Sequence, residues 1–242
     1  MAINAPILQT VLQTARLVGP RSRMLSLGYS DMLVSEPQLQ ALCGPDILER
    51  IAFREDSASI LRWHNVAGEV SRIAETRSLF EAMGVETDFV DIVASRGCEI
   101  VMDLNEPALP AMIGAYDLIY DGGTMEHCFN VGQVMRNIHA MTRRGGYIVH
   151  LNPVNYFNHG FYNFNPTFYH DFYTQSGNRI VGDFHVLYGP VFGSKVARVH
   201  PTAGGAELPA KSVVLVVAQK TSEAVPGWPT QTKYLNNPNL AG

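Results

Sequence analysis

Apolar side chains along the chain follow two different spacings. In residues 5–19, apolar side chains recur at every third or fourth position, and Gly19-Pro20 ends the segment. This pattern predicts a helix. The same spacing predicts helical segments at 37–83, in two or three pieces, and at 131–146, where basic residues and then glycines mark the end. Short apolar runs predict strands at 24–27, 87–92, 98–104, 116–121, 147–153 and 212–220.

Strands that alternate with helices, several of them almost wholly apolar, are typical of an α/β protein. The pattern therefore predicts a doubly wound, mainly parallel sheet with helices on both faces. The sequence has no repeat, low-complexity tract or linker that would divide it. We expect one domain over residues 1–242, with an N-terminal helix in 1–22, a core over 23–221 and a tail over 222–242.

The residues that follow the predicted strands are candidates for a binding site, because ligands of such sheets bind at the carboxyl ends of the strands. They are Gly28-Tyr29-Ser30-Asp31, Asp91, Asp103-Leu104, Asp121-Gly122-Gly123 and Asn152-Pro153. Asp91 could accept both hydroxyls of a ribose, and Asp103 or the backbone after it could meet an adenine amino group. A single strand-end aspartate more often caps a turn. Several on one rim favour a nucleoside site.

Two nucleotide-binding motifs are absent from the sequence. No GxGxxG follows the first predicted strand, and no GxxxxGK[ST] occurs anywhere. Dinucleotide binding through a glycine fingerprint and P-loop hydrolysis therefore lose their main support. Gly28 remains at the first strand end, where it either lets a ligand approach the backbone or serves an ordinary turn.

The stretch YDLIYDGGTMEH, residues 116–127, begins as a buried strand, breaks at Asp121-Gly122-Gly123 and then presents Glu126 beside His127. An imidazole can take up a proton near neutral pH. His127 is therefore a candidate general base; alternatively, it is a helix N-terminal residue that hydrogen-bonds a neighbouring loop.

Residues 152–173 interleave aromatic side chains with asparagines and histidines. Such a surface could hold a sugar, an aromatic compound or a small polar metabolite against its rings. We expect Asn155, Tyr156, Asn158, Phe161 and Tyr162 to belong to the substrate side of the site. His159 and His170-Asp171 are further candidate bases. Alternatively the aromatic residues pack beneath the sheet, which is favoured for Phe164, Phe168 and Phe172. His150, His159 and His170 match no tight metal-binding spacing, so no metal is expected.

Taken in order, these segments resemble the class I S-adenosylmethionine-dependent methyltransferases. The order strand-Gly, strand-Asp, strand-Asp-Leu and YDLIYDGGTMEH is similar to their first four strands, and MTRRGGYIVHLNP is similar to their next helix end, turn and fifth strand. MDLNEP, DGGTMEHCFN and NHGFYNFNPTFYHDFY together resemble a bacterial subgroup found near surface-polysaccharide genes. The resemblance runs from about Arg23 to Asp171, and more weakly through Lys220.

The resemblance implies a Rossmann-like, seven-stranded sheet and S-adenosylmethionine as cofactor. It implies methylation of a small molecule, with oxygen of a sugar or other hydroxyl or acid metabolite as the expected acceptor atom. Gly122 and Gly123 would pass close to the methionine part of the cofactor, with Glu126 and His127 on the substrate side. The implied cofactor residues are Gly28, Tyr29, Ser30, Asp31, Asp91, Asp103, Leu104, Asp121, Gly122 and Gly123. His159, slightly favoured, and His127 are the candidate bases.

The sequence departs from the family pattern in two places. The first loop, SLGYSDM, has one glycine where the family has E/D-x-G-x-G-x-G, so Asp31 or backbone amides near Tyr29 and Ser30 would contact the methionine. Asp91 also lies about sixty residues after Gly28, about three times the usual gap, which indicates inserted helices. Two alternatives remain open: a cofactor-binding enzyme that catalyses another step, and a non-catalytic binding or scaffold protein, which the short loop favours.

Composition limits the class of protein further. Hydrophobic residues make up 46% of the chain, which suits a packed core, and a net charge of −4 argues against a nucleic-acid binder. Cys43, Cys98 and Cys128 have no paired spacing, which favours a reducing compartment. No signal peptide is recognised, and the longest apolar run, 213–218, is too short for a membrane span. We expect a soluble cytoplasmic protein with a small-molecule acceptor, no nucleic-acid or membrane partner, and a homodimer as one option.

Overall fold

The computed structural model describes residues 2–205, 207–235 and 237, and its helices follow most of the predicted ones. They are α1 (Ala5–Val18), α2 (Glu36–Cys43), α3 (Ile47–Arg50), α4 (Ser57–Trp63), α5 (Thr76–Ala82), α6 (Val131–Met141), α7 (Pro166–Gln175) and α8 (Thr232–Leu235). Three short 3-10 helices are η1 (Pro110–Met112), η2 (Met125–His127) and η3 (Val191–Gly193). Of the predicted tail over 222–242, residues 236 and 238–242 lie outside the described residues. Within the described part, no helix has the length and apolar content that crossing a membrane requires.

Most strands belong to one large sheet. The strands are β1 (Ala2–Ile3), β2 (Ser22–Leu27), β3 (Asp31–Met32), β4 (Val85–Asp91), β5 (Glu99–Val101), β6 (Tyr116–Asp121), β7 (Thr142–Asn155), β8 (Arg179–Ile180), β9 (Phe184–Tyr188), β10 (Lys195–Val199) and β11 (Ser212–Gln219). The main sheet has the order β10-β9-β11-β7-β6-β2-β4-β5, with β8 pairing with β11. β1 and β3 form a separate parallel pair.

The sheet is mixed, which corrects part of the predicted fold. β5, β4, β2, β6 and β7 are parallel neighbours, as expected for the α/β class. β11 runs antiparallel to β7, β8 and β9, and β10 runs antiparallel to β9. The prediction of seven strands was wrong, because the described residues form a main sheet of nine. β8, β9 and β10 are short, and β10 is half-exposed, so they lack the long apolar runs that marked the other strands.

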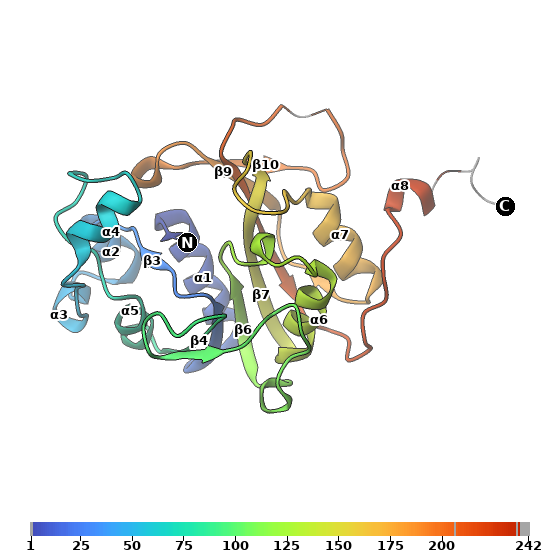
Figure 1. Ribbon diagram of the computed structural model, residues 1–242, viewed down its shortest axis with the longest axis horizontal. Coiled ribbons are helices and arrows are strands. Elements are labelled where there is room, and N and C mark those ends of the chain that lie inside the picture. The colour runs from blue at the N-terminus through green and yellow to red at the C-terminus, as the bar shows by residue number, and fades with distance from the viewer. Residues whose placement is uncertain (1, 206, 236, 238–242) are drawn as a thin grey trace.

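Helices cover both faces of the sheet, as predicted, because neighbouring residues of each strand point in opposite directions. Leu118 and Tyr120 of β6 pack in the cluster that contains α1, α2 and α5, whereas Ile119 packs in the cluster that contains α6 and α7. In Figure 1, α1 and α5 lie on one side of β6 and β7, and α6 and α7 lie on the other.

The long segment between the first two large strands forms an insertion. It contains α2, α3 and α4 before α5, one more helix than the most that the sequence pattern predicted for 37–83. Leu33, Ile60, Leu61 and Ile73 give the insertion a small apolar core of its own. In Figure 1 these helices lie at the left of the molecule, near β3. The insertion accounts for the wide gap between Gly28 and Asp91.

Candidate functional site

A linear chain of three hydrogen-bonded side chains lies beneath the end of β6. We name Asp121, His150 and Tyr173 the inner triad. Asp121 Oδ2 lies 2.9 Å from His150 Nδ1, and His150 Nε2 lies 2.6 Å from the Tyr173 hydroxyl. Asp121 Oδ1 also accepts the backbone N–H groups of Thr124, at 3.3 Å, and Met125, at 3.2 Å.

Tyr173 remains neutral inside the protein. Burial, and then the charge of Asp121, raise the pKa of Tyr173 well above its ordinary value, so its hydroxyl stays protonated. Each ring nitrogen of His150 has one hydrogen-bond partner, the Asp121 carboxyl group at Nδ1 and the Tyr173 hydroxyl at Nε2. All three side chains are buried and satisfied, which indicates that the inner triad stabilises the fold.

A second chain runs beside the first and ends at the sheet rim. We name Glu126, Asn152 and Tyr169 the rim triad. The Tyr169 hydroxyl donates to Asn152 Oδ1 at 2.6 Å, and Asn152 Nδ2 donates to Glu126 Oε2 at 3.0 Å. Burial raises the pKa of Tyr169 too, with Asp121 and Glu126 as further causes. Glu126 is 1% exposed, yet no hydrogen bond reaches its Oε1 from the described residues.

Two regular spacings place the triads side by side. His150 and Asn152 are two residues apart on β7, so they point to the same face of the sheet. Tyr169 and Tyr173 are four residues apart on α7, so they stand one turn apart on one helix face. Pro166, at the start of α7, fixes where the helix begins.

The free side of Glu126 faces two imidazoles. We name Glu126, His127 and His159 the donor cluster. Glu126 Oε1 lies 3.5 Å from His159 Nε2 and 3.9 Å from His127 Nε2, and the two rings are 5.3 Å apart between centroids. His127 belongs to η2, directly after β6, whereas His159 comes from the loop between β7 and α7.

The loop between β7 and α7 is held against Glu126 by its backbone. Phe161 N–H donates to the Glu126 carbonyl oxygen at 2.8 Å. A Cβ on Gly160 would lie 2.8 Å from that same oxygen, so only glycine permits this approach. His159 also stacks on Tyr156, with ring centroids 4.3 Å apart. The backbone contact and the stack on Tyr156 together fix the position of His159.

The donor cluster opens into a cavity of about 340 Å³. Gly122 and Gly123 form part of the wall next to the cluster, with Tyr156 from the loop. The remaining wall comes from the N-terminus, the insertion and the far strands, with Asn4, Trp63, His64, Tyr188, Ser194 and Lys211. The cavity thus combines an apolar lining with several polar groups, which suits a small polar ligand.

The predicted substrate residues divide into two groups. Glu126 and Tyr156 line the cavity together with both candidate bases, His127 and His159. The others do not line the cavity. Asn155 donates to the carbonyls of Leu208 and Pro209, Tyr162 donates to the Phe129 carbonyl, Phe161 packs edge-on against Phe129, and Asn158 is an exposed residue in the left-handed region. Phe164 and Phe172 are buried beneath the sheet, and Phe168 is half-buried.

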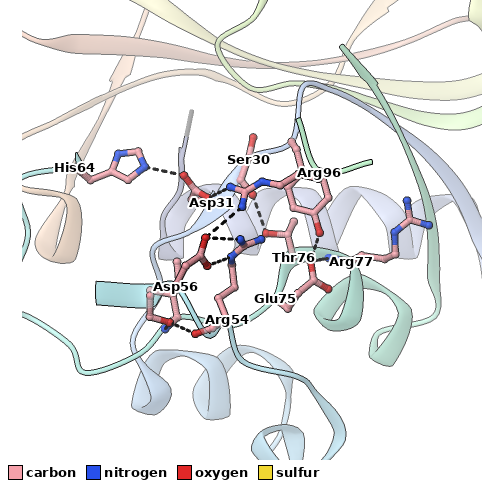
Figure 2. Close-up of polar contacts among 12 residues, drawn as sticks. Ser30, Asp31, Arg54, Asp56, His64, Glu75, Thr76, Arg77 and Arg96 are labelled. Atoms are coloured by element: carbon pink, nitrogen blue, oxygen red, sulfur yellow. Dashed lines mark hydrogen bonds and ion pairs between the residues drawn. The ribbon is translucent and has the colours of Figure 1, made fainter. Parts of the chain in front are cut away.

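The side chains of the first loop are engaged with the insertion. Asp31 lies between His64 Nε2 and Arg96, at 2.9 Å from each, and Arg96 also approaches Asp56, which pairs with Arg54 (Figure 2). These contacts bind the loop after β4 and the insertion to the start of β3. They leave the Asp31 carboxylate little capacity for another cation.

Tyr29 is held through its side chain, and Ser30 through its backbone carbonyl. Tyr29 stacks on Phe89 at 4.1 Å between centroids, and its hydroxyl hydrogen-bonds Glu75, which caps the N-terminus of α5. The Ser30 carbonyl accepts the Thr76 hydroxyl at 2.7 Å. Gly28 has a φ of 81°, in the region that favours glycine, so the chain turns sharply at the end of β2.

The other carboxylates on the rim differ in how many hydrogen bonds they accept. Asp103 is exposed and caps a turn, because its Oδ1 accepts both N–H groups of Asn105, backbone and side chain. Leu104 is buried, and its carbonyl accepts the Asn137 side chain. Asp91 is half-buried and accepts one backbone N–H, from Ile92, through Oδ1. The next side chain, Ile92, is 63% exposed and presents an apolar surface beside this carboxylate.

The packing of Tyr120 against Gly122 requires a glycine at this position. A Cβ there would lie 2.4 Å from the ring of Tyr120, so a larger residue would displace this buried side chain. Gly123 has a φ of 92° and turns the chain toward η2. Both glycines also line the cavity, and they join the predicted cofactor side to the donor cluster.

Sequence reasoning missed the distant walls of the cavity. Asn4 caps α1 by accepting Ile7 N–H, and its Nδ2 donates to Ser194 at 2.8 Å. The cap could be read from Asn4 before Ala5-Pro6, but its contact with Ser194 could not. The pairing of His150 with Asp121 was also missed, and strand alternation alone could only have placed His150 on a buried face.

No protein-family model matches this sequence, and no curated protein matches it either. Several solved structures share parts of its chain trace. A 1,6-didemethyltoxoflavin-N1-methyltransferase from Burkholderia thailandensis, with bound 1,6-didemethyltoxoflavin and S-adenosylhomocysteine, is 15% identical over 90% of this chain and 79% of its own, with a TM-score of 0.45. A possible histamine N-methyltransferase from Thermotoga maritima is 13% identical over 90% and 91%, with a TM-score of 0.39.

A candidate sarcosine dimethylglycine methyltransferase from Galdieria sulphuraria is 12% identical over 64% of this chain, with a TM-score of 0.37, and the match spans 48% of that protein. At this level of identity and TM-score, the matches assign no activity to the present chain. The fold described above rests on the strand order and on the helices that cover the sheet.

Proposed function

We propose that this protein is an S-adenosylmethionine-dependent methyltransferase that acts on an oxygen atom of a small molecule. The observation that supports this most is the position of the donor cluster. Glu126, His127 and His159 lie where β6 ends, on the rim that also carries Gly28 and Asp91, and they open into a cavity of small-molecule size.

The rim residues fit the nucleoside part of the cofactor. Asp91 has capacity left to accept ribose hydroxyls, and exposed Ile92 would cover an adenine ring. The backbone at Gly28, Gly122 and Gly123 would lie along the methionine part. The side chains of the first loop fit less well, because Asp31 is already paired. When bound, the cofactor supplies an electrophilic methyl group on its sulfonium sulfur.

The donor cluster would prepare the acceptor. A hydroxyl held in the cavity must lose its proton as its oxygen attacks the methyl carbon. The Nε2 atoms of His127 and His159 are within reach of such a hydroxyl, and buried Glu126 would stabilise positive charge on either ring. The aromatic wall at Tyr156 would hold the acceptor in line for the displacement.

Calorimetric titration with S-adenosylhomocysteine tests the proposal. We expect binding, with a rise in unfolding free energy of about 2.7 kcal/mol at a ligand concentration of 100 times Kd. Asp91→Ala should weaken binding, whereas Asp46→Ala, which removes an exposed carboxylate from α3's N-cap, should not. Absence of binding by either cofactor form would exclude the methyltransferase.

A non-catalytic binding protein is the second candidate, and the engaged first loop favours it. Tyr29 and Asp31 are held by the insertion rather than directed at a ligand. In that case S-adenosylhomocysteine should not bind, while a small polar ligand should still enter the cavity. Mass spectrometry of compounds retained through purification separates the two functions, because only the first predicts a retained cofactor.

A further inference from the structure

The geometry points to a binding site for a first-row divalent metal ion, formed by the donor cluster Glu126, His127 and His159. Metal binding is independent of the proposed methyl transfer, but the role given to the ion below rests on that function. Glutamate oxygen and imidazole nitrogen together are a donor set that zinc and its neighbours accept.

The donor atoms are already close to metal-binding distances. Glu126 Oε1 lies 3.5 Å and 3.9 Å from the two Nε2 atoms, and all three lie within 4.8 Å of one another. Zinc–nitrogen and zinc–oxygen bonds of about 2.0–2.1 Å place two tetrahedral ligands about 3.3 Å apart. The His127 and His159 side chains are 49% and 38% exposed, so small rotations of the rings can close the remaining gap.

The buried carboxylate needs a positive partner. Glu126 is 1% exposed, and its Oε2 is satisfied by a neutral amide, that of Asn152. Among the described residues, no lysine or arginine forms an ion pair with Glu126. A buried carboxylate without a cation beside it is costly, and a metal ion between Oε1 and the two imidazoles would supply that positive charge.

The surroundings orient the donors in the way that metal sites require. The rim triad fixes the carboxylate, since Tyr169 holds Asn152 and Asn152 holds Oε2, which leaves Oε1 directed at the rings. Gly160 and the Phe161 N–H hold the loop against the Glu126 backbone, and the stack on Tyr156 holds the ring of His159. These contacts keep the cluster assembled from two separate segments.

Three protein ligands leave at least one coordination position open, and here it faces the cavity. An acceptor hydroxyl or carboxylate oxygen would occupy that position. The ion would lower the pKa of the hydroxyl, so its proton passes to solvent water. The oxygen would then bond to the methyl carbon, while the carbon–sulfur electron pair stays on sulfur. His127 and His159 would hold the ion rather than accept the proton.

The expectation that no metal binds rested on the spacing of histidines in the sequence. That spacing does not address this cluster, because His127 and His159 come from segments on either side of α6 and β7. Only the folded chain brings them to one carboxylate.

Metal titration of the full chain tests the inference. Protein treated with a chelator should bind Zn²⁺ with one-to-one stoichiometry in calorimetry, and Co²⁺ should give the visible absorption of a protein-bound ion. Glu126→Gln and His159→Ala should each weaken Zn²⁺ binding at least tenfold. His200→Ala, which removes an exposed histidine outside the cluster, should leave it unchanged. No binding, or equal binding by all variants, would overturn the site.

Tyr169→Phe tests the orientation of the donors. The Asn152–Glu126 contact remains but loses its support, and loss of such an outer partner typically costs about 10–100-fold in metal affinity. Unchanged affinity in a folded variant would contradict this role. The two proposals fail separately: Zn²⁺ binding without S-adenosylhomocysteine binding removes only the methyltransferase, and the reverse removes only the metal site.

Discussion

The inner triad and the rim triad use similar side chains in parallel positions, yet they have different properties. Each begins with a carboxylate at or shortly after the end of β6, Asp121 in the strand and Glu126 in η2, continues through β7 and ends at a tyrosine of α7. In the inner triad every polar side-chain atom has a hydrogen-bond partner. In the rim triad, Glu126 keeps an oxygen for the two imidazoles and the cavity.

This difference separates a structural role from a functional one. A fully satisfied buried network stabilises a single arrangement of the core and gains nothing from a ligand. A buried carboxylate whose second oxygen accepts no hydrogen bond and meets only half-exposed imidazoles at a cavity wall is stabilised by a ligand that binds there. The comparison therefore assigns stability to Asp121 and His150, and chemistry to Glu126 and His159.

Removal of His159 tests this division between structural and functional roles most directly. We expect His159→Ala to lower kcat by about 10²–10⁴-fold at saturating cofactor, because the acceptor loses either the base that takes its proton or, with an ion bound, a ligand of the ion that acidifies it. Affinity for S-adenosylhomocysteine should stay nearly the same. Product formation can be followed by mass spectrometry with acceptors that the protein methylates. Full turnover in both His159→Ala and His127→Ala would show that positioning alone carries the reaction.

Removal of the inner histidine should act on stability instead. His150→Ala leaves the Asp121 carboxylate buried without its imidazole, and breaking a buried pair in this way costs about 3–5 kcal/mol. The free energy of unfolding, measured by urea denaturation, should fall by this amount. His127→Ala is the matched control, since its half-exposed ring should change stability by only about 0.5 kcal/mol. Equal losses in the two variants would contradict the division of roles.

Gly160→Ala tests how closely the loop must approach Glu126. The added methyl group would meet the Glu126 carbonyl and Cγ, so we expect a loss of about 1–3 kcal/mol in unfolding free energy and displacement of His159. Gly204→Ala is a control, because no atom lies within 4 Å of a Cβ there. A shift in the His159 imidazole NMR signals would report the displacement. Unaltered signals together with unaltered stability would show that the loop adapts.

The smallest effect concerns His139, a buried histidine of α6 outside both triads. Burial, and then the charge of Lys220, lower its pKa in the folded protein to about 4, against about 6.5 when unfolded. Because the unfolded chain binds more protons, His139 should destabilise the fold as pH falls from about 6.5 to 4. Stability curves of the wild type and His139→Gln should diverge over this range. Parallel curves would mean that the ring is solvated.

Local pattern was sufficient for much of the fold. Long apolar runs located β2, β4, β6, β7 and β11, and helical spacing located α1 and α6. It failed for β8, β9 and β10, since these short strands are defined by their pairing partners rather than by their own residues. The position of Gly28, Asp91 and Asp121 at strand ends was likewise predictable, because it follows from strand boundaries.

The chemistry of the site was predictable only in part. His127 could be placed beside the rim from YDLIYDGGTMEH, and His159 could be proposed from its aromatic neighbours. The engagement of Asp31 by His64 and Arg96 could not be foreseen, because the insertion that supplies one partner folds back from outside the sheet. Nor could the approach of His159 to Glu126, which depends on a glycine contact between distant segments.

The loop between β7 and α7 also bears on how such a site could diversify. It contributes His159 and Tyr156 to the cavity, while the sheet and α7 hold the carboxylate in place without it. Its ends are anchored independently, by the pairing of β7 with β11 and by the start of α7 at Pro166. Exchange of this one segment could therefore change acceptor preference while the scaffold persists. In evolutionary terms, the molecule separates a fixed frame from a replaceable recognition module.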